Sequence, residues 1–473
     1  MVKIKEAFER ALGEILARVS LSDGEDADHG NLRSIAVAYS GGLDSSALLH
    51  LAHDYSREHG ISLHAFHVHH GLSGNADEWL RHCESQCERL GISFDVRHVA
   101  ITKDNGKGIE EAARSRRYAA LGEMCRTHQV SLLLTAHHQD DQAETVLLQL
   151  LRGAGVAGLS GMDASNTAAG LLGDPDLTLA RPLLSVTRND LESYAARREA
   201  DHVEDESNAD LRFSRNALRH QVLPLLAHHF PGFQERLART ARHAQFAQRL
   251  LDQLAQADWQ ICRDREHLDA GRLKCLDSDR ISNLLRYWLG LHGLQMPSTA
   301  WLLQAQTQLL AARDDAQICI ALADCEIRRY RNRIMLIHKS HLDADEVALP
   351  FAWRGETQIY VKEYGGTLQF SATELDGVDA VWLRGQQLQI RNYRGELRLK
   401  IATNRSTRSL KSHCQERSIP AWERKQMPLL FIGAELLFAA GVGTACKFLG
   451  EGPGQRIRIT WESDRKDIAA AGA

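Results

Sequence analysis

The stretch Ile35–Ser45 reads IAVAYSGGLDS, and it decides the fold of the first third of the chain. Its first five residues form a short apolar run typical of a buried strand, and helical spacing follows from Asp44 to Glu58. Between them, two glycines allow a tight turn that presents backbone N–H groups without side-chain obstruction. The N-terminus of the following helix adds its dipole and free amides, which attract anions. The stretch therefore predicts a phosphate-binding loop between a strand and a helix.

The chain beyond this loop alternates apolar strands with amphipathic helices. Further strands are expected at residues 63–69, 92–99 and 130–136, and helices at residues 76–90 and 109–128. Strands that are apolar throughout and alternate with helices indicate a parallel sheet covered on both faces. The predicted fold class is therefore α/β, with a Rossmann-like parallel sheet. Ligands of such sheets bind at the carboxyl ends of the strands, where the loops leave.

The rest of the chain predicts two further domains. Residues 1–230 are expected to form the catalytic domain and residues 233–375 a helical, then mixed, substrate-binding domain. Residues 380–460 are expected to form a small α+β C-terminal domain. Polar and apolar residues alternate in Ile327–Ile334, which predicts strands there. At the other end of the chain, the helical spacing of Phe8, Leu12 and Ile15 indicates an amphipathic N-terminal helix rather than a secretory signal.

The composition excludes several classes of protein. Of the 473 residues, 44% are hydrophobic and 25% charged, which excludes wholesale disorder. A formal net charge of −4 excludes a bulk polycation that coats nucleic acid. No apolar run approaches the roughly 18 residues of a membrane helix. The nine cysteines are scattered without a CxxC pair, so we expect a reducing, cytoplasmic location.

The loop after the first strand supplies the candidate ATP-binding residues. These are Ser40, Gly41, Gly42, Leu43, Asp44 and Ser45. The serine hydroxyls can donate to phosphate oxygens, and Asp44 can hold Mg²⁺. A Walker loop is missing, because Gly106–Gly108 has the lysine but lacks the hydroxyl residue after it.

A second acidic segment follows the fourth predicted strand and reads HHQDDQAET over residues 137–145. Asp140 or Asp141 is expected to cap the next helix, with Glu144 one turn further on the same face. Three gathered carboxylates repel one another unless Mg²⁺ or a substrate ammonium lies among them. A solvated acidic first turn that complements the helix dipole is the alternative. Residues 155–162 are expected to form a glycine-rich loop over the site.

Basic residues gather in three places. Arg114 and Arg117 share a helical face with Tyr118, and Arg215 and Arg219 stand one turn apart, a spacing that suits phosphate. Residues 384–425 carry 11 basic residues, among them Arg408 and Lys411, against three acidic ones. Such a patch supplies phosphate affinity without reading sequence. In each place an exposed, solvated charged face is the alternative.

Together these strings resemble the tRNA(Ile)-lysidine synthetase family, within the superfamily of PP-loop ATP pyrophosphatases. The resemblance covers residues 35–224 and, more loosely, residues 398–443. Its strings are SGGLDS, HVHHGLS (67–73), GIEEAARSRRY (108–118), HHQDDQAET, LLRGAGVAGLSGM (150–162), RPLL (181–184), EDESN (204–208) and SRNALR (214–219). One departure from the family pattern is HVHHGLS, which has His69 and Ser73 where family members commonly have Asn and Arg.

The resemblance implies a ligase that attaches L-lysine to C2 of the wobble cytidine, position 34, in the CAU anticodon of tRNA(Ile). ATP would be split to AMP and pyrophosphate through an adenylated cytidine, and codon reading would change from AUG to AUA. We expect Asp44 and Asp141 to hold Mg²⁺, and Asp140 and Glu144 to face the lysine. The arginines named above and Lys411 are expected to bind phosphate or tRNA. A homodimer is compatible with the sequence, and no membrane partner is expected.

Three other functions stay open at this point. A PP-loop tRNA 2-thiolation enzyme would need reactive cysteines at the site, whereas Cys83, Cys87 and Cys125 lie on predicted helices. A non-catalytic RNA-binding module would leave the first third of the chain unexplained. A metal-dependent phosphohydrolase would leave SGGLDS unused. Its candidate ligands are His67, His69, His70, His137, His138, Asp140 and Asp141.

Overall fold

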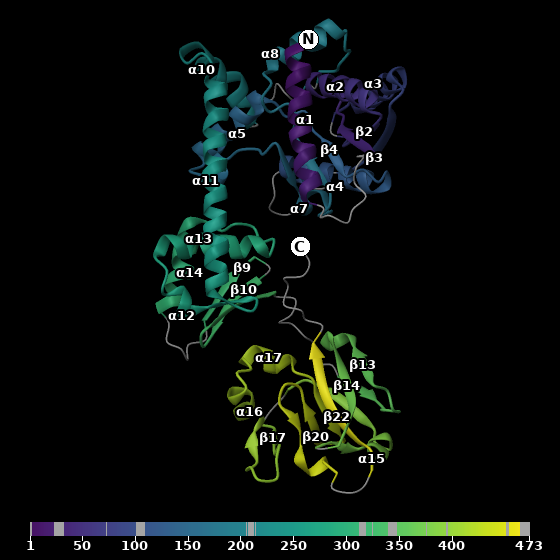
Figure 1. Ribbon diagram of the computed structural model, residues 1–473, viewed down its shortest axis with the longest axis vertical. Coiled ribbons are helices and arrows are strands. Elements are labelled where there is room, and N and C mark those ends of the chain that lie inside the picture. Colours follow the sequence, from purple (N-terminus) through teal and green to yellow (C-terminus); the bar gives the residue numbers. More distant parts are fainter. Residues whose placement is uncertain are drawn as a thin grey trace. The chain divides into compact units, whose positions relative to one another are not determined.

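The computed structural model describes most of the chain, which divides into two compact units, residues 1–252 and 253–473 (Figure 1). The described residues are 2–22, 33–71, 73–100, 109–204, 206, 212, 214–311, 318–323, 325–338, 348–374, 376–393, 396–450 and 454–463. The Gly106–Gly108 segment, Leu72 of HVHHGLS and most of EDESN lie outside them. Within the described part, no helix is long and apolar enough to cross a membrane.

The first unit alternates helices and strands as the sequence predicts. In chain order its elements are α1 (Val2–Ser22), β1 (Ser34–Ala38), α2 (Leu43–His59), β2 (Ser62–His69), α3 (Ala76–Leu90), β3 (Ser93–His98), α4 (Ile109–Thr127), β4 (Leu132–Leu134), α5 (Gln139–Leu151), α6 (Val156–Leu159), β5 (Ser165–Thr167), α7 (Ala169–Leu172), β6 (Thr178–Ala180), α8 (Arg188–Arg198), α9 (Ser214–Ala217), the π-helical turn η2 (Leu218–Val222), α10 (Leu223–His229) and α11 (Phe233–Cys262), whose last residues belong to the second unit.

The six strands form one sheet in the order β3-β2-β1-β4-β6-β5. All neighbours pair in parallel except the edge strand β5, which runs antiparallel to β6. The predicted parallel α/β sheet is confirmed, with this one antiparallel edge added. The chain places β2 on one side of β1 and later returns to place β4 on the other side. The loops after β1 and β4 therefore diverge at a topological switch point, where such sheets bind ligands.

Alternate residues of the strands face two different helical layers. Ile35 and Val37 pack in one core with α1, α2, α3 and α8, whereas Ala36 packs in a second core with α4 and α7. Phe8 and Leu12 of α1 are fully buried in the first core. Each such side chain contributes about 1.5–3 kcal/mol on burial, so the N-terminal helix is part of the folded domain, as its spacing predicts.

The second unit contains short helices and antiparallel strands. Its elements are β7 (Arg263–Asp264), β8 (His267–Asp269), α12 (Ala270–Leu273), α13 (Ser278–Leu291), α14 (Thr299–Ala311), β9 (Ile318–Leu322), β10 (Cys325–Tyr330), β11 (Arg333–His338), β12 (Leu349–Phe351), β13 (Gln358–Val361), η4 (Lys362–Tyr364), β14 (Gly366–Thr373), β15 (Val378–Asp379), α15 (Ala380–Arg384), β16 (Leu388–Arg391), β17 (Arg398–Leu399), β18 (Arg408–Ser409), α16 (Leu410–Glu416), α17 (Ala421–Gln426), β19 (Leu429–Ile432), β20 (Glu435–Ala439), β21 (Gly443–Thr444), η5 (Cys446–Phe448) and β22 (Arg456–Ser463).

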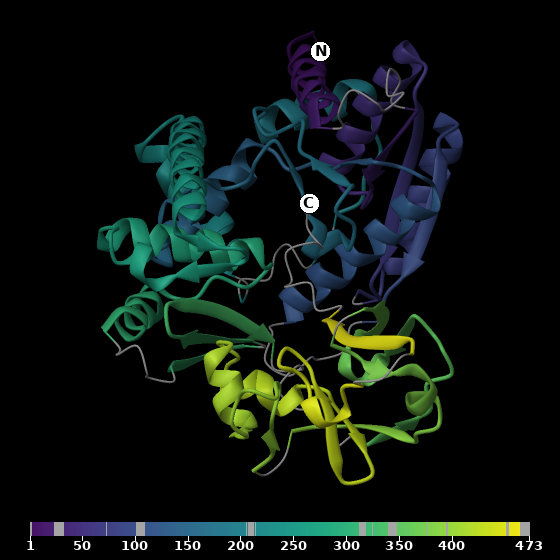
Figure 2. The same ribbon diagram turned by 60° about the horizontal axis from the view of Figure 1, so that its bottom comes forward.

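The strands predicted at Ile327–Ile334 are present as the β10–β11 hairpin, in which Tyr330 pairs with Arg333. The final strand β22, yellow in Figure 2, pairs along the whole of β14 and lies between β14 and β15 in a four-stranded sheet. The helical and α+β character expected after the first domain is thus confirmed. The domain limits expected at residues 230 and 380 stay predictions.

Candidate active site

The loop after β1 has a conformation that requires glycine at one position. Gly41 has φ +83°, and a Cβ atom there would lie 2.8 Å from Sγ of Cys83 and 3.2 Å from Cγ2 of Val203. The backbone N–H of Val203 donates to the Gly41 carbonyl at 2.9 Å. The loop is therefore held against α3 and the segment after α8, and only glycine fits at this point.

Two serines close the loop around the start of α2. The hydroxyls of Ser40 and Ser45 lie 3.0 Å apart, and Ser45 also donates to the Gly42 carbonyl at 2.9 Å. Gly42 is the N-cap of α2, and no side chain caps it. The N-terminal amides of this 17-residue helix thus stay available to an anion, as the predicted phosphate loop requires.

The helix after β4 begins differently from the prediction. His138, not Asp140 or Asp141, is the N-cap of α5, because the extended backbone after β4 continues through this residue. Asp141 occupies the third helical position, and its Oδ2 accepts the His138 backbone N–H at 3.0 Å. The capping box directs the carboxylate of Asp141 back toward the carboxyl end of the sheet.

His138 lies among carboxylates from both loops. Its Nε2 is 3.5 Å from Oδ2 of Asp44 and 3.4 Å from Oδ2 of Asp141. Burial alone would lower the pKa of this imidazole, but Asp140, Asp44 and Asp141 raise it to about 10. Oδ1 of Asp44 is buried without a hydrogen-bond partner. An orphaned carboxylate oxygen at this place fits a hard cation such as Mg²⁺.

Arg215 and Arg219 reach the same site and pair with its acids. Glu144 is 1% exposed; its Oε1 accepts Nε of Arg219 at 2.7 Å, and its Oε2 accepts Nε of Arg215 at 2.6 Å. Both guanidinium groups also donate to Oδ1 of Asp141, at 3.0 and 3.3 Å. The cations that the clustered carboxylates require are therefore supplied by the chain itself.

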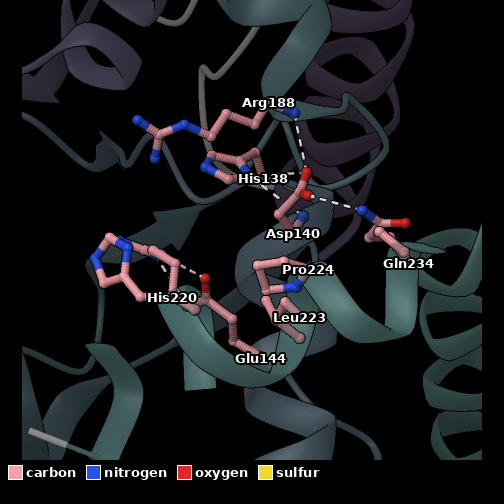
Figure 3. Close-up of a pocket in the computed structure, with 10 residues that line it drawn as sticks. His138, Asp140, Glu144, Arg188, His220, Leu223, Pro224 and Gln234 are labelled. Carbon is pink, nitrogen blue, oxygen red and sulfur yellow. Dashed lines mark hydrogen bonds and ion pairs between the residues drawn. The ribbon is translucent and has the colours of Figure 1, made fainter. Parts of the chain in front are cut away.

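Asp140 faces a cavity of about 390 Å³ (Figure 3). Its Oδ2 accepts the backbone N–H of Arg188 at 2.9 Å, and its Oδ1 accepts Nε2 of Gln234 on α11 at 3.3 Å. Burial would raise the pKa of this carboxyl, but His138 and these donors lower it to about 2. Asp140 is therefore an oriented anion at neutral pH. Glu144, Arg219 and His220 also line this cavity, which we call the acidic cavity.

A larger cavity of about 880 Å³ opens over the loop after β1. Its lining includes Ser40–Ser45 together with Arg117 and Tyr118 of α4. The guanidinium groups of Arg114 and Arg117 lie 5.0 and 5.7 Å from the Tyr118 ring centre, so these three share a face as predicted. We call this second space the loop cavity.

His137 also lines the loop cavity and differs sharply from its neighbour His138. Burial, assisted by nearby guanidinium groups, lowers the pKa of His137 to about 3, despite the opposing effect of Asp141. Its Nδ1 lies 3.0 Å from the Thr135 hydroxyl. The surroundings of these adjacent histidines therefore shift the pKa of the two rings in opposite directions.

The glycine-rich segment at residues 155–162 contains the short helix α6, and hydrogen bonds hold its C-terminal end in place. Gln142 of α5 forms two hydrogen bonds with the Met162 backbone, at 2.8 and 2.9 Å. Gln245 of α11 donates to the carbonyls of Ser160 and Met162 at 2.9 and 3.1 Å. The segment is thus anchored to both α5 and α11 rather than being a simple loop.

Of the two departures from the family pattern, His69 lines the loop cavity and Ser73 lies in the turn before α3. Nε2 of His69 is 3.0 Å from Oδ1 of Asp77, and its ring centre is 4.5 Å from that of His98. The Ser73 hydroxyl accepts the Asn75 backbone N–H at 3.1 Å just before α3. Both residues therefore have local partners that make this turn.

In the second unit, some side chains of the basic segment, residues 384–425, form local contacts. Arg408 lies 3.3 Å from Glu416, and Arg424 is buried and donates to the Ile419 carbonyl. Lys411 is exposed on α16. The tRNA contacts expected of Arg408 and Lys411 stay predictions.

Sequence reasoning missed two residues of the site and the position of a third. The third is His138, a candidate metal ligand from the sequence, whose place between Asp44 and Asp141 follows only from strand order. Gln234 and the backbone of Arg188 position Asp140, and no local pattern indicates either. The roles expected of the predicted site residues stay predictions, although the structure gathers Asp44, Asp140, Asp141, Glu144, Arg215 and Arg219 at one strand edge.

The geometry disfavours the rival functions. Cys83, Cys87 and Cys125 are buried, and burial raises the pKa of each thiol to about 12, which suppresses the thiolate that sulfur transfer needs. Among the residues that the structure describes, no three His, Cys, Asp or Glu side chains are grouped to hold a metal ion. The proposed histidine-rich phosphohydrolase centre is therefore not assembled.

A largely parallel sheet with an uncapped glycine loop at its switch point is typical of nucleotide-binding proteins. Three family models match the chain accordingly: a PP-loop domain over residues 5–226, a TilS substrate binding domain over 268–335 and a TilS substrate C-terminal domain over 388–461.

Curated relatives extend this match over most of the chain. The tRNA(Ile)-lysidine synthase of Burkholderia pseudomallei is 42% identical over 91% of this chain and 93% of its own length. That of Ralstonia nicotianae is 40% identical over 90% and 93%, and that of Coxiella burnetii 37% identical over 86% and 88%. The chain belongs to the tRNA(Ile)-lysidine synthase family.

Proposed function

We propose that this protein ligates lysine to C2 of the wobble cytidine in the CAU anticodon of tRNA(Ile), with ATP converted to AMP and pyrophosphate. The observation that carries the proposal is the adjacency of two cavities. Arg188, Arg219 and His220 line both the loop cavity and the acidic cavity. A site for a nucleotide thus shares a wall with a site whose carboxylates suit an ammonium group.

The loop cavity suits activation of the cytidine. The C2 carbonyl of cytidine is a poor electrophile, and its oxygen is a poor leaving group until it is joined to AMP. The cytidine O2 attacks the α-phosphorus, the bond between the α-phosphorus and the bridging oxygen breaks, and pyrophosphate leaves. Amides at the start of α2 and the hydroxyls of Ser40 and Ser45 stabilise the charge that develops on the phosphates.

The acidic cavity suits the second step. Its volume of about 390 Å³ is at the lower end of small-ligand sites, and Asp140 offers an oriented carboxylate to a lysine ammonium. The attacking amine must be neutral, although its pKa in water is about 10.4. It then forms a bond to C2, the C2–O bond breaks, and AMP leaves. The nearby carboxylates can accept the proton as water is excluded.

A divalent cation fits in the loop cavity, whose lining includes Asp44 and Asp141. Asp44 fits Mg²⁺ because one of its carboxylate oxygens is buried without a partner. Asp141 would be the second ligand. When bound, Mg²⁺ would neutralise phosphate charge and favour departure of pyrophosphate.

The proposal also covers the cellular location, the affinity for tRNA and the oligomeric state. The nine cysteines are free, which suits the reducing cytoplasm. The basic segment at residues 384–425 would add phosphate affinity for the tRNA. The homodimer compatible with the sequence stays a prediction, and analytical ultracentrifugation of the purified chain tests it.

The direct test is incubation with ATP, isotope-labelled lysine and a tRNA(Ile) transcript, followed by mass analysis of the nucleosides. The proposal predicts a modified cytidine at position 34 that carries the label. Matched controls are a transcript with uridine at position 34 and a reaction without ATP. A labelled wobble nucleoside that forms without ATP, or no label with all substrates present, would contradict it.

A further inference from the structure

We infer that Arg219, assisted by Arg215, keeps the acidic cavity closed to lysine until a nucleotide enters the loop cavity. The triphosphate draws the guanidinium groups away, and the freed carboxylates then accept the ammonium. Binding of ATP would thus precede and strengthen binding of lysine. This inference rests on the proposed function and adds the order in which its substrates bind.

The first observation is that both oxygens of Glu144 accept hydrogen bonds from guanidinium groups. Besides the bonds from Nε of Arg219 and Nε of Arg215, its Oε2 accepts a second nitrogen of Arg219 at 3.0 Å. The carboxylate is 1% exposed, so water does not compete for it. A lysine ammonium would have to displace a guanidinium group, and the two nearby positive charges would repel it.

The second observation extends the same constraint to Asp141. Both arginines donate to its Oδ1, while its Oδ2 accepts the backbone N–H of His138. Each oxygen of both carboxylates thus accepts at least one hydrogen bond within the chain, so a cation that approaches either carboxylate competes with the arginines. Asp140 alone keeps its orientation through uncharged donors, from Gln234 and the Arg188 backbone.

The third observation is the position of Arg219 between the two cavities. Its side chain is 26% exposed and lines both of them. Guanidinium groups bind phosphate oxygens in pairs as readily as they bind carboxylates. A triphosphate on the loop after β1 therefore offers Arg219 a second set of partners. The residue belongs to the π-helical turn η2, a form of helix frequent at functional sites.

The energetic consequence is coupling between the two substrates. When the arginines turn to the phosphates, Glu144 becomes a buried charge without a partner, which is strongly unfavourable. An arriving ammonium removes that cost. Coupling between sites is reciprocal, so lysine must strengthen nucleotide binding by the same factor.

The test is titration calorimetry with L-lysine and the purified full-length protein, with and without α,β-methylene-ATP and Mg²⁺. This analogue resists cleavage at the bond that the proposed reaction breaks. We expect lysine to bind about tenfold or more tightly with the analogue, within the range of about 5- to 150-fold typical of coupled sites. Equal affinities in the two titrations, with lysidine still formed, would overturn the inference and leave the proposed function standing. No lysine binding in either titration and no lysidine would overturn both.

Two variants assign the coupling to the residue. Arg219→Gln is expected to bind lysine without nucleotide more tightly than the wild type and to reduce the coupling factor to about 1. Arg219→Lys keeps the charge but not the paired donors, so an intermediate factor is expected. Arg236→Gln is the control, because this exposed guanidinium group on α11 donates only to the carbonyls of Phe230 and Pro231 among the contacts described. A wild-type coupling factor in folded Arg219→Gln and Arg219→Lys would contradict the inference.

Discussion

Replacing Gly41 by alanine tests whether the loop after β1 has to keep its observed shape. The new Cβ would lie 2.8 Å from Sγ of Cys83, closer than carbon and sulfur atoms pack, and 3.2 Å from Val203. The left-handed backbone at φ +83° adds about 1–2 kcal/mol for any residue with a Cβ. Overpacking adds about 1–3 kcal/mol. The sum, about 2–5 kcal/mol, has to be relieved by a shift of the loop.

The expected result is a large loss of activation without loss of the fold. If about 2–4 kcal/mol of this strain appears at the transition state, RNA-dependent AMP formation falls by about 30- to 900-fold in kcat/KM. The assay is the release of AMP from labelled ATP, with circular dichroism to verify folding.

The double variant Gly41→Ala with Cys83→Ala separates the two causes. Alanine at position 83 removes the sulfur atom that the new methyl group meets, so part of the activity is expected to return, while the backbone strain remains. Cys83→Ala alone is expected to keep most of its activity, because the buried thiol takes no part in the chemistry. Wild-type AMP formation by Gly41→Ala would refute the assigned loop geometry.

Three further perturbations test other parts of the site. Gln234→Ala removes a hydrogen bond to ionised Asp140, so the KM for lysine is expected to rise about tenfold while the KM for ATP stays unchanged. A change in the KM for ATP alone would contradict the role of Gln234 in orienting Asp140. Asp141→Asn is expected to slow adenylation most at limiting Mg²⁺, and wild-type rates there would remove the metal role. Burial raises the pKa of Cys83 to about 12, so its thiol stays protonated between pH 7 and 9. Cys83 is therefore expected to resist iodoacetamide, whereas the exposed Cys275 reacts. Equal labelling of the two cysteines, read by peptide mass analysis, would contradict the burial of Cys83.

Much of the first unit could be predicted because its signals are local. Apolar runs such as Ile35–Tyr39 and the helix starts beside them depend on neighbours in sequence, and the observed β1 (Ser34–Ala38) and α2 (Leu43–His59) differ from the expected ranges by one residue. The gathering of Asp44 and Asp141 at one edge also follows, since both loops leave the carboxyl ends of strands.

The partners of those residues could not be predicted, because they depend on tertiary packing. Helical spacing predicts that Arg215 and Arg219 share one face of a helix. It does not predict that this face contacts Glu144 rather than a phosphate group. Gln234 contacts Asp140 from a helix 94 positions away in sequence. The antiparallel edge strand β5 also gives no clear signal, since its three residues carry no periodicity.

The fate of one oxygen atom tests most directly whether a pyrimidine oxygen captures adenylate in this protein. A tRNA(Ile) transcript that carries ¹⁸O at O2 of cytidine 34 is incubated with ATP and lysine, and the released nucleotides are analysed by mass spectrometry. Adenylation of O2 followed by attack at C2 predicts one ¹⁸O atom in the phosphate of AMP for each lysine incorporated. AMP without the label, or release of ADP in place of AMP, would contradict it.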